Sequence, residues 1–153
     1  MKKFLSLVLL VGTMLSAIAV PVNAARPDQP ESAVALAIEP RLNNGNSCNM
    51  SFIITSSGLA EVSASYAGIT GVTSRVTITM SIEKKVSSSE WERIDIGTLT
   101  NSWTDSSTNT NGSFCHNIQL ESKGTYRGVF VIRMFGSGGT ADKIEKTIEK
   151  TYS

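Results

Sequence analysis

The chain has few of the residues from which catalytic and metal sites are built. Among its 153 residues it has one histidine, His116, and two cysteines, Cys48 and Cys115. Serine triads and Cys/His pairs need a histidine beside the nucleophile, and on a strand Cys115 and His116 would point to opposite faces. A calcium loop starting at Ser107 would have Ile118 where its twelfth-position glutamate is needed. We therefore expect no catalytic residue, no metal site and no cofactor.

Charge of one sign is also lacking, because 14 basic residues are balanced by 13 acidic ones. Binding to nucleic acid or to an anionic membrane surface draws on an excess of lysine and arginine. The composition therefore offers no electrostatic case for either partner.

Long hydrophobic runs are confined to the N-terminus. Residues 4–20 are almost wholly apolar, follow the cationic start Met1–Lys3 and end at Pro21. The run is short for a membrane span, and Val22–Ala24 fits a signal-peptidase site. We predict a signal peptide over 1–24, with cleavage after Ala25 as the alternative. The mature protein would be secreted, extracellular or associated with the cell surface, and would have no membrane span.

The rest of the chain divides into a leader and one domain. Pro27, Pro30 and the turn signal Asn43–Asn46 predict a flexible leader over 25–46. Regular alternation begins at Ser47. We therefore predict a single β-domain over 47–153.

Period-two alternation predicts an all-β fold. Residues 72–82 place valine, isoleucine and methionine on one face and threonine, serine and arginine on the other. Residues 126–134 repeat the pattern, whereas 91–96 slip in phase between Trp91 and Ile94, which indicates a bulge. Residues 141–152 fit helix or strand spacing. We predict a strand there, because Glu145 and Glu149 are like charges at i,i+4.

Export makes a disulfide between Cys48 and Cys115 the expected state. The two cysteines lie 67 positions apart, and closing a loop of that length would add about 4 kcal/mol in the chain-entropy model. Cys115, however, has the opposite parity to Phe114, His116 and the apolar positions after them. We therefore expect Phe114 and His116 to point outward and the strand to become regular only after Cys115. Two thiols without a bridge are the alternative.

The stretch Gly124-Thr125-Tyr126 resembles the tyrosine corner of immunoglobulin-like sandwiches, in which the tyrosine hydroxyl hydrogen-bonds to backbone upstream. An ordinary strand beginning with tyrosine is the alternative. Gly128 occupies the place of the usual second cysteine.

The order of the motifs in 47–153 resembles small secreted immunoglobulin-like proteins of Gram-positive gut bacteria, a group without an assigned activity. The motifs are the strand 71–78, Glu83-Lys84-Lys85, the serine-rich stretch into Trp91, and Gly124–Arg127. The resemblance implies an antiparallel β-sandwich of about seven strands with Tyr126 in a structural role. It brings no active-site residue. Gly128 and the acidic C-terminal segment depart from the pattern.

Two tryptophans, Trp91 and Trp103, are candidates for ligand contact. An exposed tryptophan beside amide and carboxylate groups can stack on sugar rings, and a polar stretch follows Trp103 directly. We predict a ligand site formed by Trp103, Asp105, Asn109 and Asn111. The alternative places Trp91 in the core and Trp103 over the end of a sheet.

These observations favour a non-enzymatic extracellular binding or interaction module whose partner is a cell-surface glycan or protein. A small cell-wall or glycan hydrolase is the main alternative and would need a carboxylate pair. Its candidates are Glu61, Glu83, Glu90, Glu92, Asp95, Asp105 and Glu121, which we interpret as solubilising charges. A structural or competition protein that self-associates through an open edge strand is a third possibility.

Overall fold

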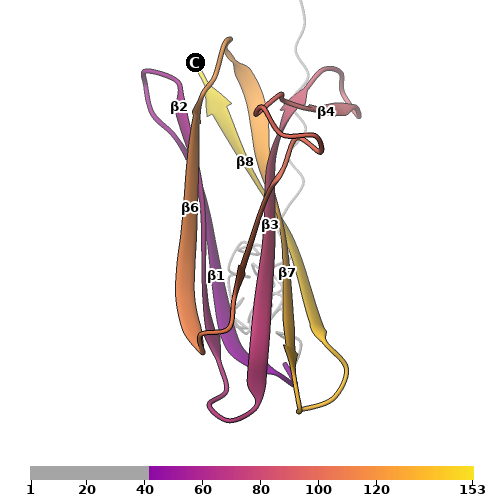
Figure 1. Ribbon diagram of the computed structural model, residues 1–153. Helices are drawn as coiled ribbons and strands as arrows, with labels where there is room; N and C mark the ends of the chain where they lie inside the picture. The colour runs from indigo at the N-terminus through magenta and orange to yellow at the C-terminus, as the bar shows by residue number, and fades with distance from the viewer. Residues whose placement is uncertain (1–41) are drawn as a thin grey trace, which may run out of the picture. The chain divides into compact units, whose positions relative to one another are not determined.

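The computed structural model describes residues 42–153 and shows an all-β domain of antiparallel strands (Figure 1). The predicted signal peptide and leader residues 25–41 lie outside the described residues. The described part contains no helix and eight strands, one more than the seven or so predicted. They are β1 (Gly45–Ile54), β2 (Leu59–Gly68), β3 (Thr73–Lys85), β4 (Trp91–Arg93), β5 (Trp103–Ser107), β6 (Asn111–Gln119), β7 (Gly124–Gly136) and β8 (Asp142–Tyr152).

The strands form two sheets in a sandwich-like arrangement. One sheet has three strands in the order β1-β2-β6, and the other has five in the order β4-β3-β7-β8, with β5 also paired to β3. Across the layers, β1 contacts β7 and β8, and β2 contacts β3 and β7. Figure 1 shows β6, β2 and β1 in one layer and β3 and β7 in the other.

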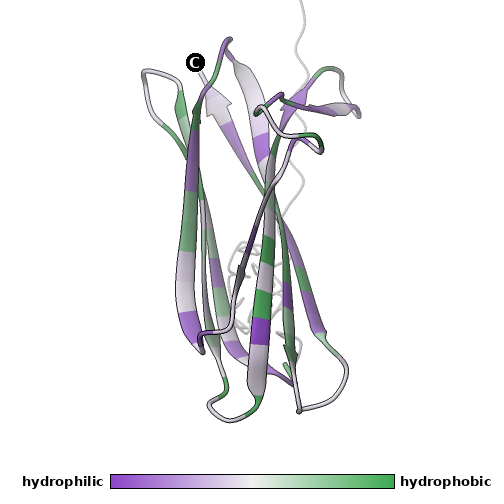
Figure 2. Ribbon diagram, viewed as in Figure 1, coloured by the Kyte–Doolittle hydropathy of each residue, from purple (hydrophilic) through white to green (hydrophobic). Residues whose placement is uncertain are grey.

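Alternation along the strands builds the core between the sheets, as predicted. The four even positions of β3 from Val76 to Ile82 are fully buried. Phe130 and Ile132 of β7 are equally inaccessible and meet Phe52 and the β2 apolar residues from the other sheet in one cluster. Figure 2 shows the resulting alternation of hydrophobic and hydrophilic residues along the strands.

The C-terminal segment is a strand, as its charge pattern predicted. β8 pairs with β7 from Gly124↔Tyr152 to Met134↔Asp142. Asp142 is buried, and its two carboxylate oxygens accept hydrogen bonds from the backbone amides of Asn43 (2.8 Å) and Asn44 (2.7 Å). The last residues of the predicted leader are therefore part of the domain.

The predicted disulfide is wrong, because no bond joins Cys48 to Cys115. The two residues lie in β1 and β6 of the same sheet, with β2 between them. Two inter-strand steps amount to about 10 Å, which exceeds the Cα separation of a disulfide. The side chains also take opposite faces, since Cys48 pairs with the buried Tyr66 and Cys115 with the outward Ser63.

The expected irregularity around Cys115 is absent as well. β6 pairs with β2 without interruption from Asn111 to Gln119. Phe114 and His116 stand opposite the buried residues Ala64 and Val62, so they face inward rather than outward. Cys115 faces outward because the regular pairing of β6 with β2 gives it the opposite face to Phe114 and His116.

Candidate functional site

The predicted site residues Trp103 and Asp105 meet His116 where the edges of the two sheets approach each other. A carboxylate oxygen of Asp105 lies 2.7 Å from Nε2 of His116. The rings of Trp103 and His116 stack with centroids 5.1 Å apart and planes 2° apart. Trp103 also packs against the core. One face of the Trp103 indole and the Asp105 carboxylate thus contact His116, and these contacts link β5 to β6.

The other two predicted residues lie elsewhere. Asn109 and Asn111 are at the turn that joins β5 to β6, beyond Ser107. Trp103 and Ser107 are four residues apart on a strand, which corresponds to about 13 Å. The structure brings Trp103 and Asp105 together and leaves Asn109 and Asn111 at the far end of β5.

Trp91 lies on the outer face of the five-stranded sheet. Its ring lies 4.3 Å from the Arg127 guanidinium carbon and 5.6 Å from the Lys85 ammonium nitrogen. It is partly buried and does not belong to the core cluster.

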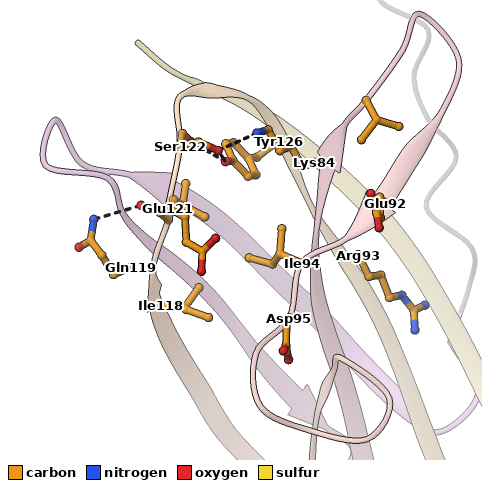
Figure 3. Close-up of a pocket in the computed structure, with 12 residues that line it drawn as sticks. Lys84, Glu92, Arg93, Ile94, Asp95, Ile118, Gln119, Glu121, Ser122 and Tyr126 are labelled. Carbon is orange, nitrogen blue, oxygen red and sulfur yellow. Dashed lines mark hydrogen bonds between the residues drawn. The ribbon is translucent and has the colours of Figure 1, made fainter.

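A pocket of about 330 Å³ opens at the opposite end of β5 and β6 from that turn (Figure 3). Its apolar surface comes from Ile94 and from Ile118 and Leu120 at the end of β6, with the Tyr126 ring beside them. The remaining lining residues are Lys84, Val86, Glu92, Arg93, Asp95, Gln119, Glu121 and Ser122. The pocket thus combines an aliphatic floor with a charged rim.

One wall of the pocket is held rigidly by the turn between β6 and β7. The hydroxyl of Tyr126 donates a hydrogen bond of 2.5 Å to the carbonyl oxygen of Ser122, four residues upstream. Lys84 Nζ donates to the Ser122 hydroxyl at 2.7 Å and lies 5.9 Å from the centre of the Tyr126 ring. The tyrosine therefore fixes the turn that carries the pocket wall.

The charges of the rim are not all available to a ligand. Arg93 points away from the pocket in Figure 3, with Nε 3.6 Å from Glu83 and Nη1 donating to the carbonyl of Thr100 at 3.3 Å. Glu121, in contrast, points into the space between Ile118 and Ile94. In the described part of the chain Glu121 forms no ion pair. The pocket therefore offers a ligand a carboxylate beside an apolar floor.

The sequence carried no signal for this pocket beyond the alternation within single strands. Its lining comes from four separate segments, 84–86, 92–95, 118–122 and Tyr126. The predicted bulge between Trp91 and Ile94 is wrong, because β4 pairs with β3 in regular register from Lys85↔Trp91 to Glu83↔Arg93 and the Ile94 amide donates to the carbonyl of Ile82 in the same register. Regular alternation turns Trp91 outward and Ile94 inward, where its side chain packs on the core and forms the pocket floor.

Cys115 is exposed on the outer face of the three-stranded sheet, and its thiol should react slowly. Local desolvation, then the charge of Glu61 and a hydrogen bond to it, raise the pKa of Cys115 above its usual value. Because the thiolate is the reactive form, alkylation should reach its half-maximal rate at a higher pH than for a free cysteine peptide. Glu61→Gln should move the profile to lower pH without restoring the free value. Iodoacetamide kinetics followed by mass spectrometry measure this, and an unchanged profile in the variant would contradict the role of Glu61.

Within residues 42–153, no group of three or more histidine, cysteine, aspartate or glutamate side chains is arranged to hold a metal ion. The same residues contain no helix long and apolar enough to cross a membrane. The chain matches no protein-family model, no curated protein and no solved structure.

Proposed function

We propose that this chain is a secreted, non-enzymatic binding or interaction module that acts outside the cell on a surface glycan or protein. The observation that carries the proposal is the pocket of Figure 3. Its volume of about 330 Å³ falls within the range of ligand sites, which combine apolar walls with a few polar groups. Ile94, Ile118 and Leu120 would contact the apolar part of a ligand, and Glu121 a hydrogen-bond donor on it.

The proposal includes an immunoglobulin-like architecture and export through the segment 1–24. In such sandwiches the first, second and fifth strands share one sheet, and the third, sixth and seventh share the other. With β4 counted as an added strand, the order β1-β2-β6 against β4-β3-β7-β8 agrees with this scheme. The hydrogen bond from Tyr126 back to Ser122 agrees with the tyrosine corner. That corner lies at the start of the sixth strand of the scheme, which is β7 here. β5 departs from the scheme, since it pairs with β3 rather than with β6.

The same features support the resemblance to secreted immunoglobulin-like proteins of Gram-positive gut bacteria, which we retain as part of the proposal. Gly128 replaces the second cysteine of antibody domains and packs on Phe52 instead, since a methyl group added to it would lie 3.0 Å from the Cβ and Cγ of Phe52. A phenylalanine side chain thus fills the centre of the sandwich where antibody domains have a disulfide.

A ligand titration of the isotope-labelled secreted protein tests the proposed site. The panel contains mucin oligosaccharides, soluble peptidoglycan fragments and extracellular-matrix peptides. We expect at least one class to shift the amide resonances of residues 94 and 118–122. Glu121→Arg should weaken that binding about tenfold, which corresponds to the loss of one charged hydrogen bond.

Glu90→Arg is the matched control, because Glu90 is exposed in the β3–β4 connection and does not line the pocket. It changes the net charge by the same amount and should leave the affinity unchanged. Equal losses in both variants, or shifts confined to other parts of the domain, would contradict the proposed site.

A hydrolase is the second candidate, and one observation favours it. Glu92, Asp95 and Glu121 surround the same pocket, and glycoside hydrolysis uses a pair of carboxyl groups. On this alternative the peptidoglycan or mucin fragments would be cleaved, and Glu121→Gln would abolish cleavage while retaining binding. Recovery of every fragment intact after prolonged incubation would rule it out for these substrates.

A further inference from the structure

The outer face of the five-stranded sheet carries two arginines without an acidic partner. Arg75 of β3 stands opposite Phe135, and Arg133 of β7 stands opposite Thr77, so the arginines are diagonal neighbours about 7–8 Å apart. Both are exposed, and in the described residues neither forms an ion pair. On the exposed face of β8 the nearest acidic residue, Glu145, is bound to Lys143 at 2.7 Å. Two cationic groups are therefore available on this face.

Arg75 is held in place before any ligand arrives. Its guanidinium carbon lies 4.5 Å from the centre of the Phe135 ring, a contact that restrains the side chain and leaves the N–H edge available. The register between β3 and β7 shifts between Thr73 and Arg75. Such bulges redirect side chains and are frequent beside functional sites.

Beside Arg75 lies a recess of about 340 Å³ that no carboxylate lines. Its other lining residues are all hydroxyl or amide side chains, Ser106, Ser107, Thr108 and Asn109. Ser106 and Ser107 end β5, and Thr108 and Asn109 belong to the turn after it. That turn is fixed, because the Tyr66 hydroxyl donates to the carbonyl of Asn109 at 3.3 Å and the Gly68 amide donates to that of Thr110 at 2.6 Å. The Thr77 and Ser106 hydroxyls lie 3.1 Å apart and extend the polar surface toward Arg133.

We propose that this face, defined by Arg75, Arg133 and residues 106–109, binds an acidic polysaccharide. An arginine fork matches the two oxygens of a carboxylate or sulfate group. The hydroxyl and amide wall suits the hydroxyl groups of the same sugar. Nucleic acid is disfavoured as a ligand, because its binding depends on neutralising several phosphates. This face offers two arginines without an acidic partner, and the whole chain has a formal net charge of only +1.

This site is separate from the pocket of Figure 3 and does not depend on it, so the two proposals can fail independently. Arg127 supplies a matched control on the same sheet. Its substitution removes the same charge, but Arg127 is already paired with Glu83 at 2.6 Å and lines neither the recess nor the pocket of Figure 3.

The test is binding of the secreted protein to immobilised polygalacturonate and chondroitin sulfate at physiological salt, with dextran as the neutral polymer. The wild type should bind one or both acidic polymers and not dextran. Arg75→Gln should weaken binding at least about tenfold, the cost of a charge-assisted hydrogen bond. Arg133→Gln should have a smaller effect and Arg127→Gln none. Arg75→Lys, which keeps the charge but loses the fork, should also bind more weakly than the wild type.

Comparison of the two polymers shows whether the recognised group is a carboxylate or a sulfate. Melting curves of each variant identify any loss that comes from unfolding, and Arg75→Lys provides the readout if Arg75→Gln does not fold. The proposal is overturned if the wild type binds neither acidic polymer, or if Arg75→Gln and Arg127→Gln weaken binding equally. Equal affinity for a DNA oligonucleotide or for polyglutamate would also overturn it.

Discussion

Phe52→Ala is expected to reduce the free energy of unfolding by about 3–5 kcal/mol, the usual cost of removing a buried phenylalanine side chain. Phe52 is 1% exposed and lies at the centre of the core. Its neighbour across the core is Gly128, which has no side chain that could move into the cavity. Urea denaturation followed by circular dichroism measures the change.

The adjacent residue provides the control for this experiment. Ile53 is 50% exposed, so Ile53→Ala should cost less than about 1 kcal/mol. Gly128→Ala alone should destabilise by about 1–3 kcal/mol through overpacking against Phe52. In the double variant the two costs should partly cancel, because the added methyl group would enter the space that the ring has left. Strict additivity of the two costs would contradict direct packing of Gly128 on Phe52.

Asp142→Ala is expected to destabilise the domain by about 2–4 kcal/mol, because it leaves the backbone amides of Asn43 and Asn44 without their acceptor. The carboxylate is buried, and so is Asn44. The Asn44 side chain in turn donates to the carbonyl of Thr140 at 2.9 Å and accepts from the amide of Gly138 at 3.0 Å. Thr73 donates through its hydroxyl to the Asn44 carbonyl. Loss of Asp142 should therefore weaken the contacts of the segment before β1 with both the β7–β8 connection and the start of β3.

Hydrogen exchange separates this mechanism from a general loss of stability. The amides of Asn43 and Asn44 should lose protection in Asp142→Ala before the central strands do. Asp142→Asn keeps one acceptor oxygen and should lie between the wild type and the alanine variant. Glu145→Ala, an exposed position on the same strand, is the control. Unchanged protection at Asn44 would contradict the anchoring role of Asp142.

Local pattern was enough to locate most strands. The alternation in 72–82 and 126–134 corresponds to β3 and β7, and the like charges Glu145 and Glu149 correctly favoured a strand for β8. Each of these inferences depends on neighbours within a few residues, which one strand carries by itself. The predicted leader, 25–46, includes residues that belong to the domain, for the opposite reason. Asn43 and Asn44 are anchored by Asp142, almost a hundred positions away in the chain, and Asn44 also by Gly138, Thr140 and Thr73.

The cysteine pairing and the predicted ligand site depended on information that the local pattern does not hold. Whether Cys48 can reach Cys115 is decided by the order of the strands in a sheet, which puts β2 between them. Whether Trp103 is free to stack on a sugar depends on β6, whose His116 covers one face of the ring. Residues that alternate correctly are compatible with many strand orders, so neither outcome could be derived from spacing.

The sequence by itself determined that the domain is built of strands and which side chains of most strands enter the core, because side chains on a strand alternate between its two faces. Only the tertiary structure decided which strands are neighbours and hence which residues form a pocket. The aliphatic floor beside Glu121 and the recess beside Arg75 each combine segments far apart in the chain. Both hollows form because the strand order and the packing of the two sheets bring these segments together. No single stretch of residues specifies that arrangement.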